Sequence, residues 1–113
     1  MPPKSNPLKL NALQLRTLSL LQGLAGNADS SVREANGEVT VIRFPQAHGD
    51  HFHIGNATVH AKDATGLYNE AVWHALDRKG LERADWPHRI TLTATGLTYD
   101  TGQGGEVFRI AKH

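Results

Sequence analysis

The sequence predicts a single small α+β domain in which a helix, a β-meander, a second helix and a β-hairpin follow one another. Leucines recur at helical spacing in residues 8–24, β-branched residues and Gly-X turns dominate residues 38–61, and apolar residues alternate with threonine in residues 89–94. The length of 113 residues suits one domain, and 39% hydrophobic with 20% charged residues is typical of a globular protein.

The N-terminal end is expected to be an arm followed by a well-marked helix. Residues 1–7 contain three prolines, which favour extended chain, so we expect a flexible arm there and the folded domain over residues 8–113. Asn11 fits the N-cap position, and Gln14 follows at the spacing of a capping box. The leucine pattern fits a core helix or, alternatively, a homodimer contact. It comprises Leu13, Leu18, Leu20, Leu21, Leu24 and Ala25.

A change of period after this helix indicates strands. Residues 38–44 are rich in β-branched side chains, and Asn36-Gly37 before them is a strong hairpin turn with residues 32–35 as partner. Two further Gly-X turns, at 49–50 and 55–56, suggest a small meander through residues 38–61.

A second helix is predicted over about residues 66–79. Asn69 or Thr65 can cap its start, and Gly80 at its end fits the left-handed position of a Schellman motif, with Leu81 packing on Leu76. Its expected buried face is Tyr68, Val72, Ala75 and Leu76. After the strand at 89–94, residues 97–100 and 106–110 are expected to pair around residues 101–105.

The segment from His48 to His60 is the richest in side chains that bind metals. Two-residue turns at 49–50 and 55–56 would set His48 opposite His51, and His51 opposite His60. One face of the strands would then carry the imidazoles of His48, His51, His53 and His60, a set that suits zinc or another divalent transition metal. A solvated polar face is the alternative. The chain has no cysteine, so a thiolate site is excluded.

Two flanking pieces resemble winged-helix DNA-binding domains of the MarR-like kind. Residues 11–21 are similar to the family's early helix, and residues 75–96 contain its Lys-Gly-Leu helix end and its Leu-Thr-x-x-Gly strand. The resemblance implies DNA binding, with the helix at 66–79 in the major groove and the hairpin at 89–110 on phosphate. The implied basic contacts are Arg78, Lys79, Arg83, Arg89 and Arg109.

The expected function is that of a small non-enzymatic binding module, nucleic-acid-binding or regulatory. The alternatives are a histidine-ligated metal protein with hydrolytic or proton-transfer chemistry, and a structural or protein-interaction domain. No nucleophile–base–orienter set supports an enzyme. Twelve basic against eleven acidic residues give a net charge of only +1, so nonspecific affinity for DNA depends on local clustering. No stretch is apolar enough for a membrane span, and a cytoplasmic location is the default expectation.

Overall fold

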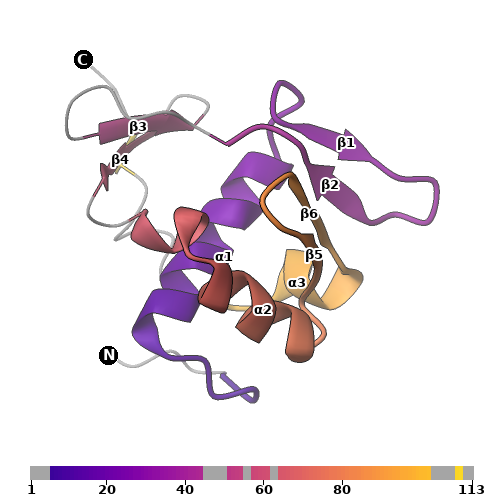
Figure 1. Ribbon diagram of the computed structural model, residues 1–113. Coiled ribbons are helices and arrows are strands. Elements are labelled where there is room, and N and C mark those ends of the chain that lie inside the picture. The colour runs from indigo at the N-terminus through magenta and orange to yellow at the C-terminus, as the bar shows by residue number, and fades with distance from the viewer. Residues whose placement is uncertain (1–5, 45–50, 55–56, 62–63, 103–108, 111–113) are drawn as a thin grey trace.

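The computed structural model describes residues 6–44, 51–54, 57–61, 64–102 and 109–110, and it has an α+β fold (Figure 1). Within these ranges, no helix combines the length and the apolar character that crossing a membrane requires. The elements are α1 (Ala12–Ala25), β1 (Ser31–Arg33), β2 (Val39–Val41), β3 (His51–Ile54), β4 (Ala57–His60), the 3₁₀ helix η2 (Thr65–Tyr68), α2 (Glu70–Arg78), β5 (Glu82–Asp85), β6 (Arg89–Leu92), α3 (Ala94–Thr98) and β7 (Arg109–Ile110).

The first helix forms as its capping signals predict, and it occupies the centre of the fold. The Asn11 side chain accepts from the Gln14 backbone N–H at 2.8 Å, and the Gln14 side chain accepts from the Asn11 N–H at 3.0 Å. Both halves of the capping box are therefore present. Five leucines of α1 are buried, namely Leu15, Leu18, Leu20, Leu21 and Leu24. They pack inside the domain, as the core interpretation requires, and the dimer contact stays a prediction.

A four-stranded antiparallel sheet in the order β1-β2-β6-β5 packs against this helix. The turn that contains Asn36 and Gly37 joins β1 to β2 as predicted, and Gly37 adopts the positive φ of 90° that favours glycine. The prediction of one meander through residues 38–61 is wrong. Strand β2 pairs with β6 from the distant tail, whereas β3 and β4 belong to a separate sheet, in the order β3-β4-β7.

The second helical region is broken into η2 and α2 rather than running as one helix. The Asn69 side chain accepts from the Ala71 N–H at 3.0 Å and caps α2. At the other end, Gly80 has a φ of 78°, and the Leu81 N–H donates to the Leu76 carbonyl at 3.1 Å, which completes the predicted Schellman motif. Tyr68 was predicted to be buried, but it is 52% exposed because it lies in η2 and not on the apolar face of α2.

Trp73 takes the central place on the buried face of α2. Its indole N–H donates to the Leu67 carbonyl at 3.0 Å, so the buried polar group is satisfied. Its ring meets Trp86 edge-on, with 4.6 Å between the ring centroids, and Phe44 lies 5.3 Å away. Both tryptophans are therefore packing residues.

The tail departs from the predicted arrangement. β6 pairs in a hairpin with β5, a strand that the sequence did not indicate, and the strand predicted to run to Ala94 stops at Leu92. Thr93 then caps α3 by accepting from the Gly96 N–H, so the strand predicted over residues 97–100 is wrong. Residues 109–110 pair with β4 instead, and residues 106–108 lie outside the described ranges.

The described end of the predicted arm is held by side-chain hydrogen bonds. Asn6 both donates to the Leu10 carbonyl and accepts from the Leu10 N–H, each at 3.0 Å. The Tyr99 hydroxyl donates to Asn6 and accepts from the Leu8 N–H. Residues 1–5 lie outside the described part of the chain.

Candidate metal centre

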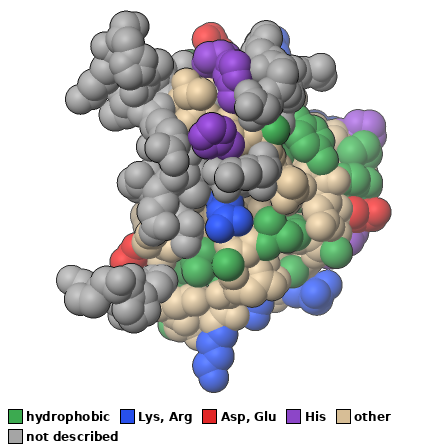
Figure 2. Space-filling view, turned by 90° about the vertical axis from the view of Figure 1, so that its left-hand side faces the viewer, with side chains coloured by type: hydrophobic (Ala, Val, Ile, Leu, Met, Phe, Trp, Pro, Cys, Tyr) green, Lys and Arg blue, Asp and Glu red, His purple; other side chains and the backbone are tan. Residues whose placement is uncertain are grey.

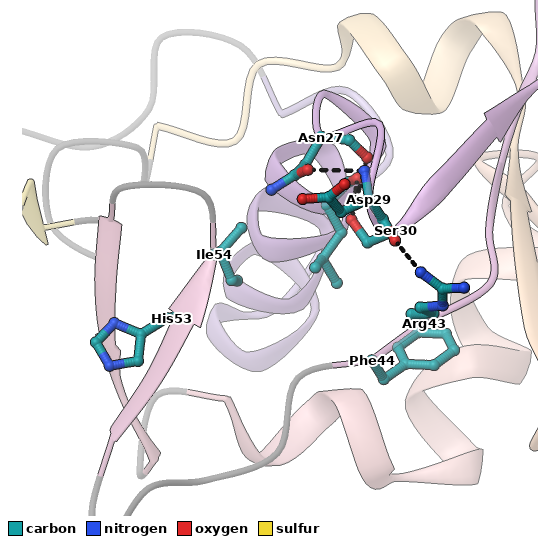
Figure 3. Close-up of a pocket in the computed structure, with 8 residues that line it drawn as sticks. Asn27, Asp29, Ser30, Arg43, Phe44, His53 and Ile54 are labelled. Atoms are coloured by element: carbon teal, nitrogen blue, oxygen red, sulfur yellow. Dashed lines mark hydrogen bonds between the residues drawn. The ribbon is translucent and has the colours of Figure 1, made fainter.

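The β3–β4 hairpin carries the predicted histidine face. Its register sets His51 opposite His60 and His53 opposite Thr58, as the turn at 55–56 predicts. Ile54, which follows His53 on β3, and Val59, which precedes His60 on β4, are buried in the core. Figure 3 shows the Ile54 side chain pointing toward α1 and the His53 ring pointing the other way. The strand alternation therefore puts the imidazoles on the outer face of the hairpin.

Two of these imidazoles form a hydrogen bond with each other through their Nε2 atoms. The distance from His51 Nε2 to His53 Nε2 is 3.2 Å, and the rings meet edge-on with their centroids 4.8 Å apart. Two nitrogens bound to one tetrahedral zinc at about 2.05 Å stand about 3.3 Å apart. The pair therefore already has the spacing of two ligands on one ion. Figure 2, which looks onto the side of the molecule that bears β3 and β4, shows histidine side chains at the surface there.

The further donors predicted for this face are His60 and His48. His60 is half-buried and lies across the hairpin from His51. Within the described ranges, no group of three or more histidine or carboxylate side chains is close enough to hold an ion. His48 and the turn at 49–50 lie outside those ranges. The described residues thus bring together two of the four predicted ligands.

The predicted basic residues are engaged mostly with acids or carbonyls of this chain. Arg83 forms an ion pair with Glu38, and Arg89 Nε lies 3.1 Å from Asp85 Oδ2. The hydrogen bond from Arg83 lowers the pKa of Glu38 and, in return, raises that of Arg83 itself. Both arginines project from the β5–β6 hairpin, so these acids offset much of its positive charge.

The other three predicted basic residues differ in their surroundings. Arg78 is exposed in the last turn of α2. Lys79 is also exposed, but its Nζ donates to the Leu8 carbonyl at 3.0 Å. Arg109 lies in β7, and its side chain is outside what the structure describes. Among the described side chains of this set, Arg78 is therefore the one that forms no ion pair or hydrogen bond with another described residue.

A buried carboxyl group that the sequence did not suggest lies at the start of β5. Glu82 is 1% exposed, and neither of its carboxyl oxygens has a hydrogen-bond partner among the described residues. Burial raises the pKa of Glu82 to about 8, and the nearby charge of Asp77 contributes. Asp77 itself accepts from the Ala84 N–H at 2.9 Å, so it is fixed beside β5. Glu82 is therefore protonated at neutral pH.

Comparison of the chain with protein-family models, curated proteins and solved structures finds no match.

Proposed function

We propose that this protein binds a divalent transition metal, with zinc as the expected ion, through the imidazoles of His51 and His53. The observation that carries the proposal is the 3.2 Å separation of their Nε2 atoms, close to the separation of two nitrogens on tetrahedral zinc. Neutral imidazole is a common zinc ligand, and the chain has no thiolate that would compete for the ion.

The backbone supports this use of the two side chains. Residues two apart on a strand point to the same face, and pairing of β3 with β4 fixes the strand that carries both ligands. His60 is the candidate for a third donor because its register position is directly across from His51. A site with two or three protein ligands leaves a position for water or for a small ligand.

Metal analysis of the purified protein tests the proposal. Untagged protein dialysed against zinc and then against buffer should retain close to one equivalent of metal, measured by elemental analysis. Replacing either His51 or His53 by alanine should remove it. His74→Ala is the matched control, because His74 is an exposed histidine on α2 that pairs with Glu70. Wild-type protein that retains no metal would contradict the proposal, as would equal retention by all the variants.

Nucleic-acid binding is a second candidate, favoured by the order of elements after η2. Helix α2 is followed directly by a hairpin, which is the order that the winged-helix resemblance implies, but this hairpin is β5–β6 and does not span the residues 89–110 that the resemblance gives. Thr93 and Gly96 of the Leu-Thr-x-x-Gly motif form the cap of α3. The acids beside Arg83 and Arg89 weigh against strong binding, because they offset the charge that phosphate would meet.

A mobility-shift titration against duplex DNA at low salt tests this candidate. Arg78→Ala should weaken binding and reduce the salt slope by about one, because one phosphate contact is lost. Arg33→Ala, an exposed arginine on β1, is the control. Absence of any shift at low salt would remove nucleic-acid binding and leave the metal proposal unaffected.

A further inference from the structure

A surface pocket lies between the end of α1, the segment after β2 and the edge strand β3 (Figure 3). Its volume is about 310 Å³, which is at the lower end of the range for pockets that hold small organic ligands. We call it the Arg43 pocket, after the arginine on its rim. His53 also borders it, but the His53 ring points away from α1.

The floor of the Arg43 pocket is apolar and firmly packed. Leu24 and Ile54 are both part of the buried core, with 3% and 6% exposure. The half-buried Phe44 forms a side wall, and its ring is held against Trp73 at a centroid distance of 5.3 Å. An apolar group of a ligand can therefore contact the ring of Phe44 and the exposed edges of Leu24 and Ile54.

The rim carries two opposite charges that do not neutralise each other. Arg43 Nη1 donates to the backbone carbonyl of Asp29 at 3.0 Å, which fixes the guanidinium and leaves its other N–H groups to bind a ligand. Asn27 Oδ1 accepts from the Asp29 N–H at 2.9 Å and fixes the loop. The Asp29 carboxylate is exposed and forms no ion pair with any described residue. Figure 3 places it on the side of the pocket away from the Arg43 guanidinium.

We infer that the Arg43 pocket binds a small zwitterion with an apolar side chain, of the class of the free aliphatic α-amino acids. Arg43 binds the ligand's carboxylate, Asp29 binds its ammonium group, and Leu24, Phe44 and Ile54 receive its side chain. A simple anion would be repelled by Asp29 and a simple cation by Arg43, so the two charges together select a ligand that carries both. This inference does not depend on metal binding by the histidine pair.

Titration with L-leucine, followed by the methyl NMR signals of Leu24 and Ile54, tests the inference. We expect saturable shifts of these methyl groups at millimolar leucine. L-Leucinamide lacks the carboxylate and N-acetyl-L-leucine lacks the ammonium group, so each should bind at least tenfold more weakly than leucine.

Two variants test which protein residue binds which charged group of the ligand. Arg43→Gln should weaken leucine binding at least tenfold. It should strengthen the residual binding of leucinamide, because leucinamide is a cation that Arg43 repels. Asp29→Asn should likewise weaken leucine binding at least tenfold, and it should strengthen the binding of N-acetyl-leucine, an anion that Asp29 repels. Arg33→Gln on β1 is the control and should bind leucine as the wild type does. The melting temperature of each variant establishes that it is folded.

The inference is overturned if folded wild-type protein shows no saturable response to leucine. It is equally overturned if leucine, leucinamide and N-acetyl-leucine bind alike, because the pocket would then be a nonspecific apolar surface.

Discussion

Replacing Glu82 by glutamine should make the stability of this protein less dependent on pH. Glutamine has nearly the same shape as the protonated glutamic acid that occupies the core at neutral pH, but it cannot ionise. The Glu82 side chain lies on the core face of β5, where its cross-strand neighbour is Leu92. No described residue donates a hydrogen bond to its oxygens that would stabilise a negative charge. Ionisation therefore costs the folded state far more than the unfolded state.

The size of the effect follows from the pKa of Glu82. It is about 8 in the folded protein against an ordinary value of 4.5. Because the folded-state pKa is raised, the stabilising effect of protonated Glu82 is fully present below pH 4.5 and is lost as the pH rises through about 8. Between these two values the wild type should lose about 1.4 kcal/mol for each pH unit, and the full loss is at most about 5 kcal/mol. A domain of this size has a stability of about 5–15 kcal/mol.

Urea denaturation at a series of pH values from 5 to 10 measures this effect. The wild type and Glu82→Gln should have similar free energies of unfolding at pH 5, and the variant should be several kcal/mol more stable at pH 9. Glu70→Gln, which removes an exposed acid on α2, should follow the wild type. Parallel curves for wild type and Glu82→Gln would refute the assignment of a buried, neutral carboxyl group.

Two substitutions test how the helices are held. Asn11→Ala removes the side chain that caps α1 and should lower the free energy of unfolding by about 1 kcal/mol, seen as a lower urea midpoint with an unchanged slope. An unchanged midpoint would show that the cap does not contribute. Gly96→Ala would place a Cβ in overlap with the backbone carbonyl of Leu81, and a loss of more than about 2 kcal/mol is expected. Gly26→Ala is its control, because the new Cβ would make only ordinary contacts of 3.6 Å or longer, and equal losses for both would contradict the close approach.

Features that depend on neighbouring residues could be predicted from the sequence. The capping box at Asn11 and Gln14 and the Schellman motif at Gly80 use side chains and φ angles within a few residues, so local chemistry determines them. The β3–β4 register is also local, because a two-residue turn together with the burial of Ile54 and Val59 allows one alignment.

Features that depend on distant segments could not be predicted from the sequence. The pairing of β2 with β6 joins residues about fifty positions apart, and no periodicity specifies such a partner. Strand β5 contains Glu82, Arg83 and Asp85, which are residues typical of loops and surfaces, so its sequence carries no strand pattern. The threonines around Gly96 suggested a strand, whereas Thr93 acts as a helix cap.

The candidate sites also differ in whether neighbouring residues or distant segments determine them. His51, His53 and His60 could be placed on one face because a single hairpin carries them all. The Arg43 pocket could not be predicted as a whole. The β1–β2 hairpin brings Asp29 and Arg43 together locally, but Ile54 joins them only when β3 is placed next to the end of α1. Burial of Glu82 likewise follows from tertiary packing, and glutamate is rarely buried without a partner.

The most direct test of metal binding is a zinc titration followed by the imidazole ¹⁵N NMR signals. The account predicts that the Nε2 signals of His51 and His53 change together and are complete at one equivalent of zinc, while His74 and His88 are unaffected. Zinc that leaves both Nε2 signals unchanged, or that shifts all histidines gradually without a break at one equivalent, would contradict a site built on this pair.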